Sequence, residues 1–311
     1  MKNYSIVMII LGAVLWGTDS LFRRPLTQSY SPVTIVFLEH CVLVAVMLPS
    51  LVAARRDILR LSSRDWFSLT FIALGGSVAA TTLFTFAIKY GNPSVAVLLQ
   101  KSQPLYTTLL ARWMLQEVPG RWFWYWFGPA LVGAYLVSTP DWRAGLGFSH
   151  SQGATILAAL AAAFLWATST VFGRYVAGRL STMVITGLRF LIALPVLGFL
   201  FFLQAPAEQH LPAALRAQGM LISMALIPGL AALILYYRGL RSTIAPMASI
   251  GELAFPITAV VTNWAFLGVR LSGSQIFGGS VLVASMTALT FLNPRESTKK
   301  QETATDLQQP A

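Results

Sequence analysis

Ten stretches of about 20 mostly apolar residues follow one another along this chain, with short connections between them. A helix needs roughly this length to cross the hydrocarbon core of a bilayer. Because that core holds no water, a segment inside it must satisfy its own backbone N–H and C=O groups, as a helix does. The pattern predicts an all-α integral membrane protein with ten transmembrane helices, at residues 4–24, 33–53, 66–88, 93–115, 121–138, 153–177, 182–203, 217–237, 243–267 and 273–292. The third and eighth helices are predicted to be the weakest, because Gly75-Gly76 and Pro228-Gly229 interrupt them.

The composition excludes a water-soluble domain and gives no support to an enzyme. Hydrophobic residues make up 56% of the chain and charged residues 11%, whereas soluble domains carry about 25% charged residues. Cys41 is the single cysteine, so a disulfide framework and a Cys-based metal site are excluded. No nucleophile elbow, phosphate loop or metal-ligand spacing is present. We therefore expect no catalytic residue, no metal and no cofactor.

The positive charge of the chain predicts its orientation in the membrane. The net charge is +11, but the Lys and Arg residues punctuate the apolar stretches instead of forming one stripe, so nucleic acid is not an expected partner. With the N-terminus inside, fourteen cations fall on the cytoplasmic side and six on the other, namely Arg23, Arg24, Lys89, Arg143, Arg216 and Arg270. The positive-inside rule then places both termini in the cytoplasm. We expect a bacterial cytoplasmic (inner) membrane, with residues 293–311 as a disordered, polar cytoplasmic tail.

The second half of the chain repeats the first. LWGTDSLFRR from Leu15 aligns with LWATSTVFGR from Leu165, and the same offset places Glu39 on Arg189. The predicted halves are residues 5–138 and 153–292, with five helices each. Because five is an odd number, the second half must enter the membrane from the opposite side. Inverted repeats of this kind are typical of transporters that work by alternating access.

The repeated motifs resemble those of the EamA family of the drug/metabolite transporter superfamily. The resemblance rests on the LWG opening, the charged residue in the second helix of each half, and the NPSV and APMA starts of the fourth and ninth helices. It implies a ten-helix fold and carriage or efflux of small metabolites, with amino acids and related amphipathic compounds as common substrates. This chain departs from the family pattern at Glu39-His40, where Arg-Phe is usual, and at Val269, where the first half has Glu117.

One face of the first helix is a candidate substrate site. Trp16, Asp19 and Arg23 are spaced three and four residues apart, so an aromatic ring, a carboxylate and a cation share that face. A structural interpretation is that Asp19 only neutralises Arg23. Trp16 and its repeat partner Trp166 are expected either to stack on a flat or cationic substrate or to serve in packing.

Other charged residues inside the apolar stretches are candidates because burying them is costly without a partner or a water-filled cavity. Glu39 is expected to pair with Arg189 across the halves or with Lys101. Such a pair serves gating or is purely structural.

The fourth and ninth helices carry matching polar residues and prolines. Gln100, Lys101 and Gln103 precede Pro104, and Glu252 precedes Pro256. A proline inside a helix frees a carbonyl, and interrupted helices near the midplane often hold polar solutes in transporters. These helices therefore line the pathway or are simply kinked.

The sequence predicts a secondary transporter, an exporter, of small zwitterionic or amphipathic metabolites such as amino acids. The alternative is a carrier or exchanger of anionic metabolites, such as sugar phosphates or organic acids, held by Lys101 and Arg189. Expected partners are the substrate and the lipid bilayer. Protons are a candidate coupling ion, with Asp19, Glu39 and Glu252 as the candidate carriers.

Overall fold

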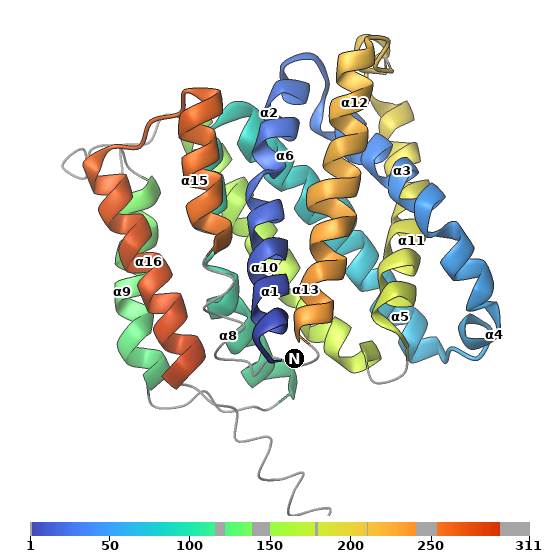
Figure 1. Ribbon diagram of the computed structural model, residues 1–311, viewed down its shortest axis with the longest axis horizontal. Helices are drawn as coiled ribbons and strands as arrows, with labels where there is room; N and C mark the ends of the chain where they lie inside the picture. The colour runs from blue at the N-terminus through green and yellow to red at the C-terminus, as the bar shows by residue number, and fades with distance from the viewer. Residues whose placement is uncertain are drawn as a thin grey trace, which may run out of the picture.

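The computed structural model describes residues 2–115, 122–138, 150–177, 180–209, 211–240 and 254–292. Glu252 and the predicted tail 293–311 lie outside these residues. All regular structure in the described ranges is helical (Figure 1). The elements are α1 (Lys2–Gly17), α2 (Asp19–Ser29), α3 (Pro32–Ala53), α4 (Arg55–Ile58), α5 (Ser63–Phe71), η1 (Ile72–Ala80), α6 (Thr81–Tyr90), α7 (Pro93–Gln100), α8 (Gln103–Leu115), α9 (Trp122–Ser138), α10 (His150–Ala177), α11 (Thr182–Leu203), η3 (Pro206–Glu208), α12 (Leu215–Met224), η4 (Ala225–Ala231), α13 (Ala232–Leu240), α15 (Ala254–Leu267) and α16 (Gly273–Leu292).

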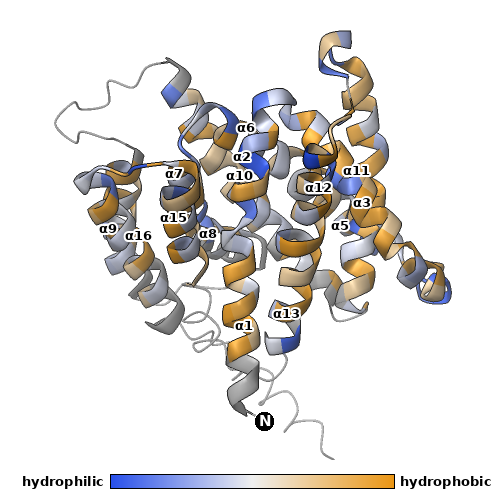
Figure 2. Ribbon diagram, turned by 45° about the horizontal axis from the view of Figure 1, so that its top comes forward, coloured by the Kyte–Doolittle hydropathy of each residue, from blue (hydrophilic) through white to orange (hydrophobic). Residues whose placement is uncertain are grey.

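The described helices have the length and surface of an integral membrane protein. Five helical stretches are long and apolar enough to cross a bilayer, and Ala254–Leu267 is a shorter apolar helix. The five are Pro32–Ala53, Ser63–Tyr90, Gln152–Gly173, Met183–Leu203 and Leu215–Tyr236. Apolar residues colour much of the outer helices in Figure 2, and large side chains such as Phe202 and Phe266 are more than 70% exposed. Such a surface is stable in lipid and unfavourable in water.

Equivalent helices of the two halves pack against each other in opposite directions. Ser31, before the first residue of α3, bonds to Gln204, which follows α11, while Leu51 near the end of α3 packs with Val184 near the start of α11. The pair α9 and α16 behaves in the same way. Gln275 donates to the Val137 carbonyl over 3.1 Å, and Ala130 packs against Leu282.

In the remaining helix packing, helices of one half contact helices of the other half. Helix α1 packs on α13 and α15, whereas its repeat equivalent α10 packs on α6, η1 and the pair α7 and α8. Each half thus supplies helices to the packing of the other.

Four helices contain interruptions near their middle. A turn at Thr18 separates α1 from α2, and a turn at Lys101–Ser102 separates α7 from α8. The π-helical segments η1 and η4 contain Gly75-Gly76 and Pro228-Gly229, where the sequence already indicated weak helices. The carbonyl of Gly76 accepts hydrogen bonds from Trp166 Nε1 at 2.9 Å and Thr81 Oγ1 at 3.2 Å. Neighbouring side chains therefore bond a backbone group at the π-helical segment, as the lipid environment requires.

The close contact between α9 and α16 generates a prediction. A Cβ at Gly133 would lie 2.7 Å from the Leu282 nitrogen and 2.8 Å from the Gly278 oxygen, both backbone atoms. Gly133→Ala should lower the thermal unfolding midpoint of the purified protein, because overpacking costs about 1–3 kcal/mol. Gly128→Ala in the same helix is the control, since nothing lies within 4 Å of its Cβ position. Equal midpoints for both variants would contradict the packing described.

Candidate functional site

Five of the site residues predicted from the sequence lie at two of these interruptions, the one between α1 and α2 and the one between α7 and α8. Trp16 is next to the last residue of α1 and Asp19 is the first of α2; Gln100 ends α7, Lys101 lies in the turn and Gln103 begins α8. An interruption exposes backbone groups that an unbroken helix would pair. These side chains therefore lie beside backbone polar groups in the middle of two helices.

Helix α15 contacts both interruptions. At Gly17, a Cβ would lie 2.9 Å from the Phe255 carbonyl oxygen, and the Thr262 hydroxyl lies 3.2 Å from the Gly17 carbonyl oxygen. Lys101 Nζ lies 4.5 Å from the centre of the Phe255 ring, a cation–π contact. Phe255 thus joins the two broken helices, although sequence reasoning did not select it.

A buried cluster of charged groups connects α2, α3 and α6. The guanidinium of Arg23 donates to Asp19 over 2.7 and 2.8 Å, to Glu39 over 3.1 and 3.3 Å, and to Thr85 Oγ1 over 3.0 Å. The contact between Asp19 and Arg23 is the one that their four-residue spacing predicts. The exposed fractions of the side chains are 4% for Arg23, 8% for Glu39 and 20% for Asp19. Asp19 is therefore the charged member that solvent reaches most.

This cluster corrects one prediction. Glu39 pairs with Arg23, and with neither Arg189 nor Lys101. The choice of partner depends on how α2 and α3 pack, which the spacing of charges along one helix does not reveal. Arg23, one of the six cations predicted for the outer side, is buried in the bundle. The predicted first helix ended at residue 24, in front of Pro25, whereas α2 continues through Pro25 to Ser29. A membrane helix tolerates such a proline when neighbouring groups satisfy the freed backbone.

The structure places Arg189 and Trp166 around η1. Arg189 Nε donates to Ser77 Oγ over 2.8 Å, and Trp166 donates to the Gly76 carbonyl and packs against Phe84 with ring centroids 5.3 Å apart. These two contacts hold the Trp166 ring against η1 and α6. Trp16 packs 5.0 Å from Tyr236 on α13.

Two amide side chains, one on α7 and one on α15, have a buried oxygen without a hydrogen-bond partner among the described residues. They are Gln100 Oε1 and Asn263 Oδ1. Asn263 Nδ2 donates to Ser94 Oγ over 3.1 Å, so it crosses between the helices. An unpaired buried acceptor costs about 1–3 kcal/mol, which favours a water or solute at these sites. Asn263 was missed, although a lone Asn in the apolar run of α15 is a visible signal.

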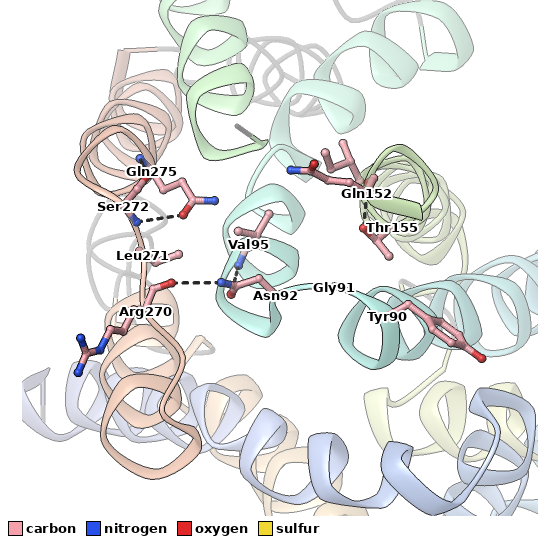
Figure 3. Close-up of a pocket in the computed structure, with 11 residues that line it drawn as sticks. Tyr90, Gly91, Asn92, Val95, Gln152, Thr155, Arg270, Leu271, Ser272 and Gln275 are labelled. Carbon is pink, nitrogen blue, oxygen red and sulfur yellow. Dashed lines mark hydrogen bonds between the residues drawn. The ribbon is translucent and has the colours of Figure 1, made fainter. Parts of the chain in front are cut away.

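A cavity of about 510 Å³ is lined by residues at helix ends, such as Tyr90, the last residue of α6, and Asn92, which precedes α7 (Figure 3). The side chains of Gln152 and Gln275 point toward it from opposite sides, whereas the Arg270 guanidinium points away. No residue predicted for the site lines it. The lining comprises Tyr90, Gly91, Asn92, Val95, Gln152, Thr155, Ile156, Arg270, Leu271, Ser272 and Gln275. Apart from Arg270, the residues that line it are uncharged.

Comparison with known proteins identifies the family. The chain is 29% identical over 301 residues to the riboflavin transporter ImpX of Fusobacterium nucleatum, covering 92% of this chain and 97% of that protein. A protein of known crystal structure has the same fold, with a TM-score of 0.64 and 19% identity over 94% of this chain and 98% of the other. The EamA-like transporter family matches residues 3–139 and again 153–291. With both halves matched, the chain belongs to the EamA-like transporter family.

Proposed function

We propose that this protein is a secondary transporter that carries a small amphipathic metabolite by alternating access, with ten transmembrane helices in two inverted halves and no enzymatic step. The observation that carries the proposal is the meeting of two interrupted helices at Phe255. Broken helices at mid-length are where transporters place solute sites. The antiparallel packing of α3 with α11 and of α9 with α16 supports the inverted arrangement.

The groups at the interruptions favour a flat, amphipathic substrate. Trp16 and Phe255 provide aromatic surface, and Gln100 provides a buried amide oxygen without a partner among the described residues. Pockets of this kind combine apolar walls with a few polar groups that orient the ligand. The relative ImpX is named a riboflavin transporter, and riboflavin has a flat ring system with amide-like groups. We propose riboflavin as the first substrate to test and zwitterionic amino acids as the second.

An anionic metabolite is the alternative substrate class, because Lys101 lies in the α7–α8 interruption, beside Phe255. A lysine ammonium is a point charge that suits carboxylates and phosphates. Arg189, the other cation predicted to hold an anion, donates to Ser77 on η1.

We further propose that both termini lie in the cytoplasm of a bacterial inner membrane. In Figure 1 the N-terminus and α4, with its neighbouring arginines, lie at the lower end of the bundle, and the start of α12 lies at the upper end. The burial of Arg23 removes one cation from the side predicted to be outside. Both observations support the orientation that the positive-inside rule predicts.

The substrate assignment is tested with purified protein in liposomes. We expect movement of riboflavin down its gradient, and Gln100→Ala should lower the rate about tenfold, since one hydrogen bond to a buried group is worth roughly 1.4 kcal/mol. Gln218→Ala, on an exposed residue of α12, should leave the rate unchanged. Uptake and release compared in liposomes that hold the protein in one orientation test whether transport runs outward, as the predicted exporter requires.

The same assay distinguishes the alternatives. A loss of anion transport alone in Lys101→Ala would support the anionic substrate. Transport of amino acids but not riboflavin would overturn the first choice. Folded wild-type protein that moves none of the riboflavin, amino acids, organic acids and sugar phosphates would overturn the proposed function.

The charged cluster is expected to hold α2 against α3 and α6 in the described conformation. Two carboxylates and one guanidinium give it a formal charge of −1. Arg23→Gln makes that charge −2, whereas Glu39→Gln makes it zero. Breaking a buried pair costs about 3–5 kcal/mol, so Arg23→Gln should lower the thermal unfolding midpoint clearly more than Glu39→Gln does. Exposed Arg216→Gln is the control. A larger decrease of the unfolding midpoint for Glu39→Gln than for Arg23→Gln would contradict the formal charges assigned.

Asp19 is the proposed proton carrier of the cluster, because it is the most exposed of the three charged side chains. Asp19→Asn should abolish the acceleration of transport by an imposed pH gradient while keeping exchange of substrate across the membrane. Exchange is measured with labelled substrate at equal pH on both sides. A pH-gradient response that survives in Asp19→Asn would exclude this role.

A further inference from the structure

The connection between α3 and α5, together with the first turn of α5, carries four exposed arginines. Residues 54–64, here called the basic corner, contain Arg55, Arg56, Arg60 and Arg64. None of the four forms an ion pair with any residue that the structure describes. Asp57 is the single carboxylate in this segment, which leaves it with a formal charge of +3. Four guanidiniums that form no ion pair within the described part of the chain are therefore available to a ligand.

A cleft at the basic corner places two of these cations beside apolar surface. It measures about 330 Å³ and is lined by Val52, Ala53, Arg55 and Arg56. The adjoining side chains of α3 are apolar and exposed, with Leu48 at 48% and Val52 at 57%. A ligand that fits here has an anionic end for the arginines and a long apolar part for α3. A phospholipid has that chemistry.

The repeat indicates that the fold itself does not require these arginines. Residues 204–214 occupy the equivalent connection in the second half and contain no Arg or Lys, while Glu208 is acidic. The two halves thus have equivalent connections, and of the two only the connection in the first half is strongly basic. In Figure 1 the connection that contains α4 projects from the edge of the bundle, at the end where α1 begins.

We propose that the basic corner is a binding site for an anionic phospholipid. The guanidiniums of Arg55 and Arg56 bind the headgroup phosphate, since the fork of an arginine fits two phosphate oxygens. Arg60 and Arg64 add attraction to the anionic membrane surface. The acyl chains lie along Leu48 and Val52 of α3. The site is separate from the transport pathway, and its test does not depend on the substrate.

The test measures lipid bound to the full-length protein. Wild-type protein in nanodiscs of phosphatidylcholine containing phosphatidylglycerol is extracted in detergent, and retained phosphatidylglycerol is quantified by mass spectrometry. We expect the double variant Arg55→Gln, Arg56→Gln to retain at least fivefold less phosphatidylglycerol and the same amount of phosphatidylcholine. Arg216→Gln, on the exposed start of α12, should match the wild type. Because the interaction is ionic, high salt should lower retention by the wild type.

Two further arms make the outcome decisive. Phosphatidylglycerol should raise the unfolding midpoint of detergent-purified wild type, and inorganic phosphate at the same concentration should not, which distinguishes a lipid from free phosphate. The double variant Arg55→Lys, Arg56→Lys keeps the charge and should retain an intermediate amount. Equal retention by wild type and the glutamine variant, or equal stabilisation by inorganic phosphate, would overturn the proposal. The measurements on the wild-type protein test the proposal even if a variant does not fold.

Discussion

The guanidinium of Arg23 is the interaction on which the arrangement of the first half depends. It is almost fully buried and reaches three helices, with bonds to Asp19 on α2, Glu39 on α3 and Thr85 on α6. A buried charge is tolerated only with partners of opposite charge. The position of each of these helices is therefore tied to the other two. A change that separates α2 from α3 must break a charged contact in a low-dielectric interior.

The same requirement explains the helix interruptions. A broken or widened helix leaves carbonyls without their usual partners, and the bilayer offers no water to bond them. In this structure a neighbouring helix supplies the partner. Thr262 on α15 lies within bonding distance of the Gly17 carbonyl, and Trp166 on α10 donates to the Gly76 carbonyl. Helices can thus be interrupted where helices of the other half reach them, which puts polar backbone at the contact between the halves.

The sequence was sufficient for features that depend on neighbours along the chain. The spacing of Asp19 and Arg23 predicted their contact, and Gly75-Gly76 indicated the weak helix that contains η1. Contacts between distant elements were not predictable in this way. Pairing of Arg23 with Glu39 requires the relative position of α2 and α3, and the bond of Arg189 to Ser77 joins residues 112 apart. The positions of charged residues along one helix do not show which of several buried groups of opposite sign each residue pairs with.

The polar residues make the two halves unequal, and this inequality bears on alternating access. In an inverted repeat, the two facing states are related by exchanging the roles of the halves. Asp19, Arg23 and Glu39 align with Ser169, Gly173 and Arg189, so the second half has no equivalent of the charged cluster. If the proposed alternating access exchanges these roles, the Arg23 contacts have no equivalent among the aligned residues of the second half. The two states would then differ in free energy even without substrate. The proposed proton at Asp19 would shift their populations, because it changes the charge of the cluster in the described state.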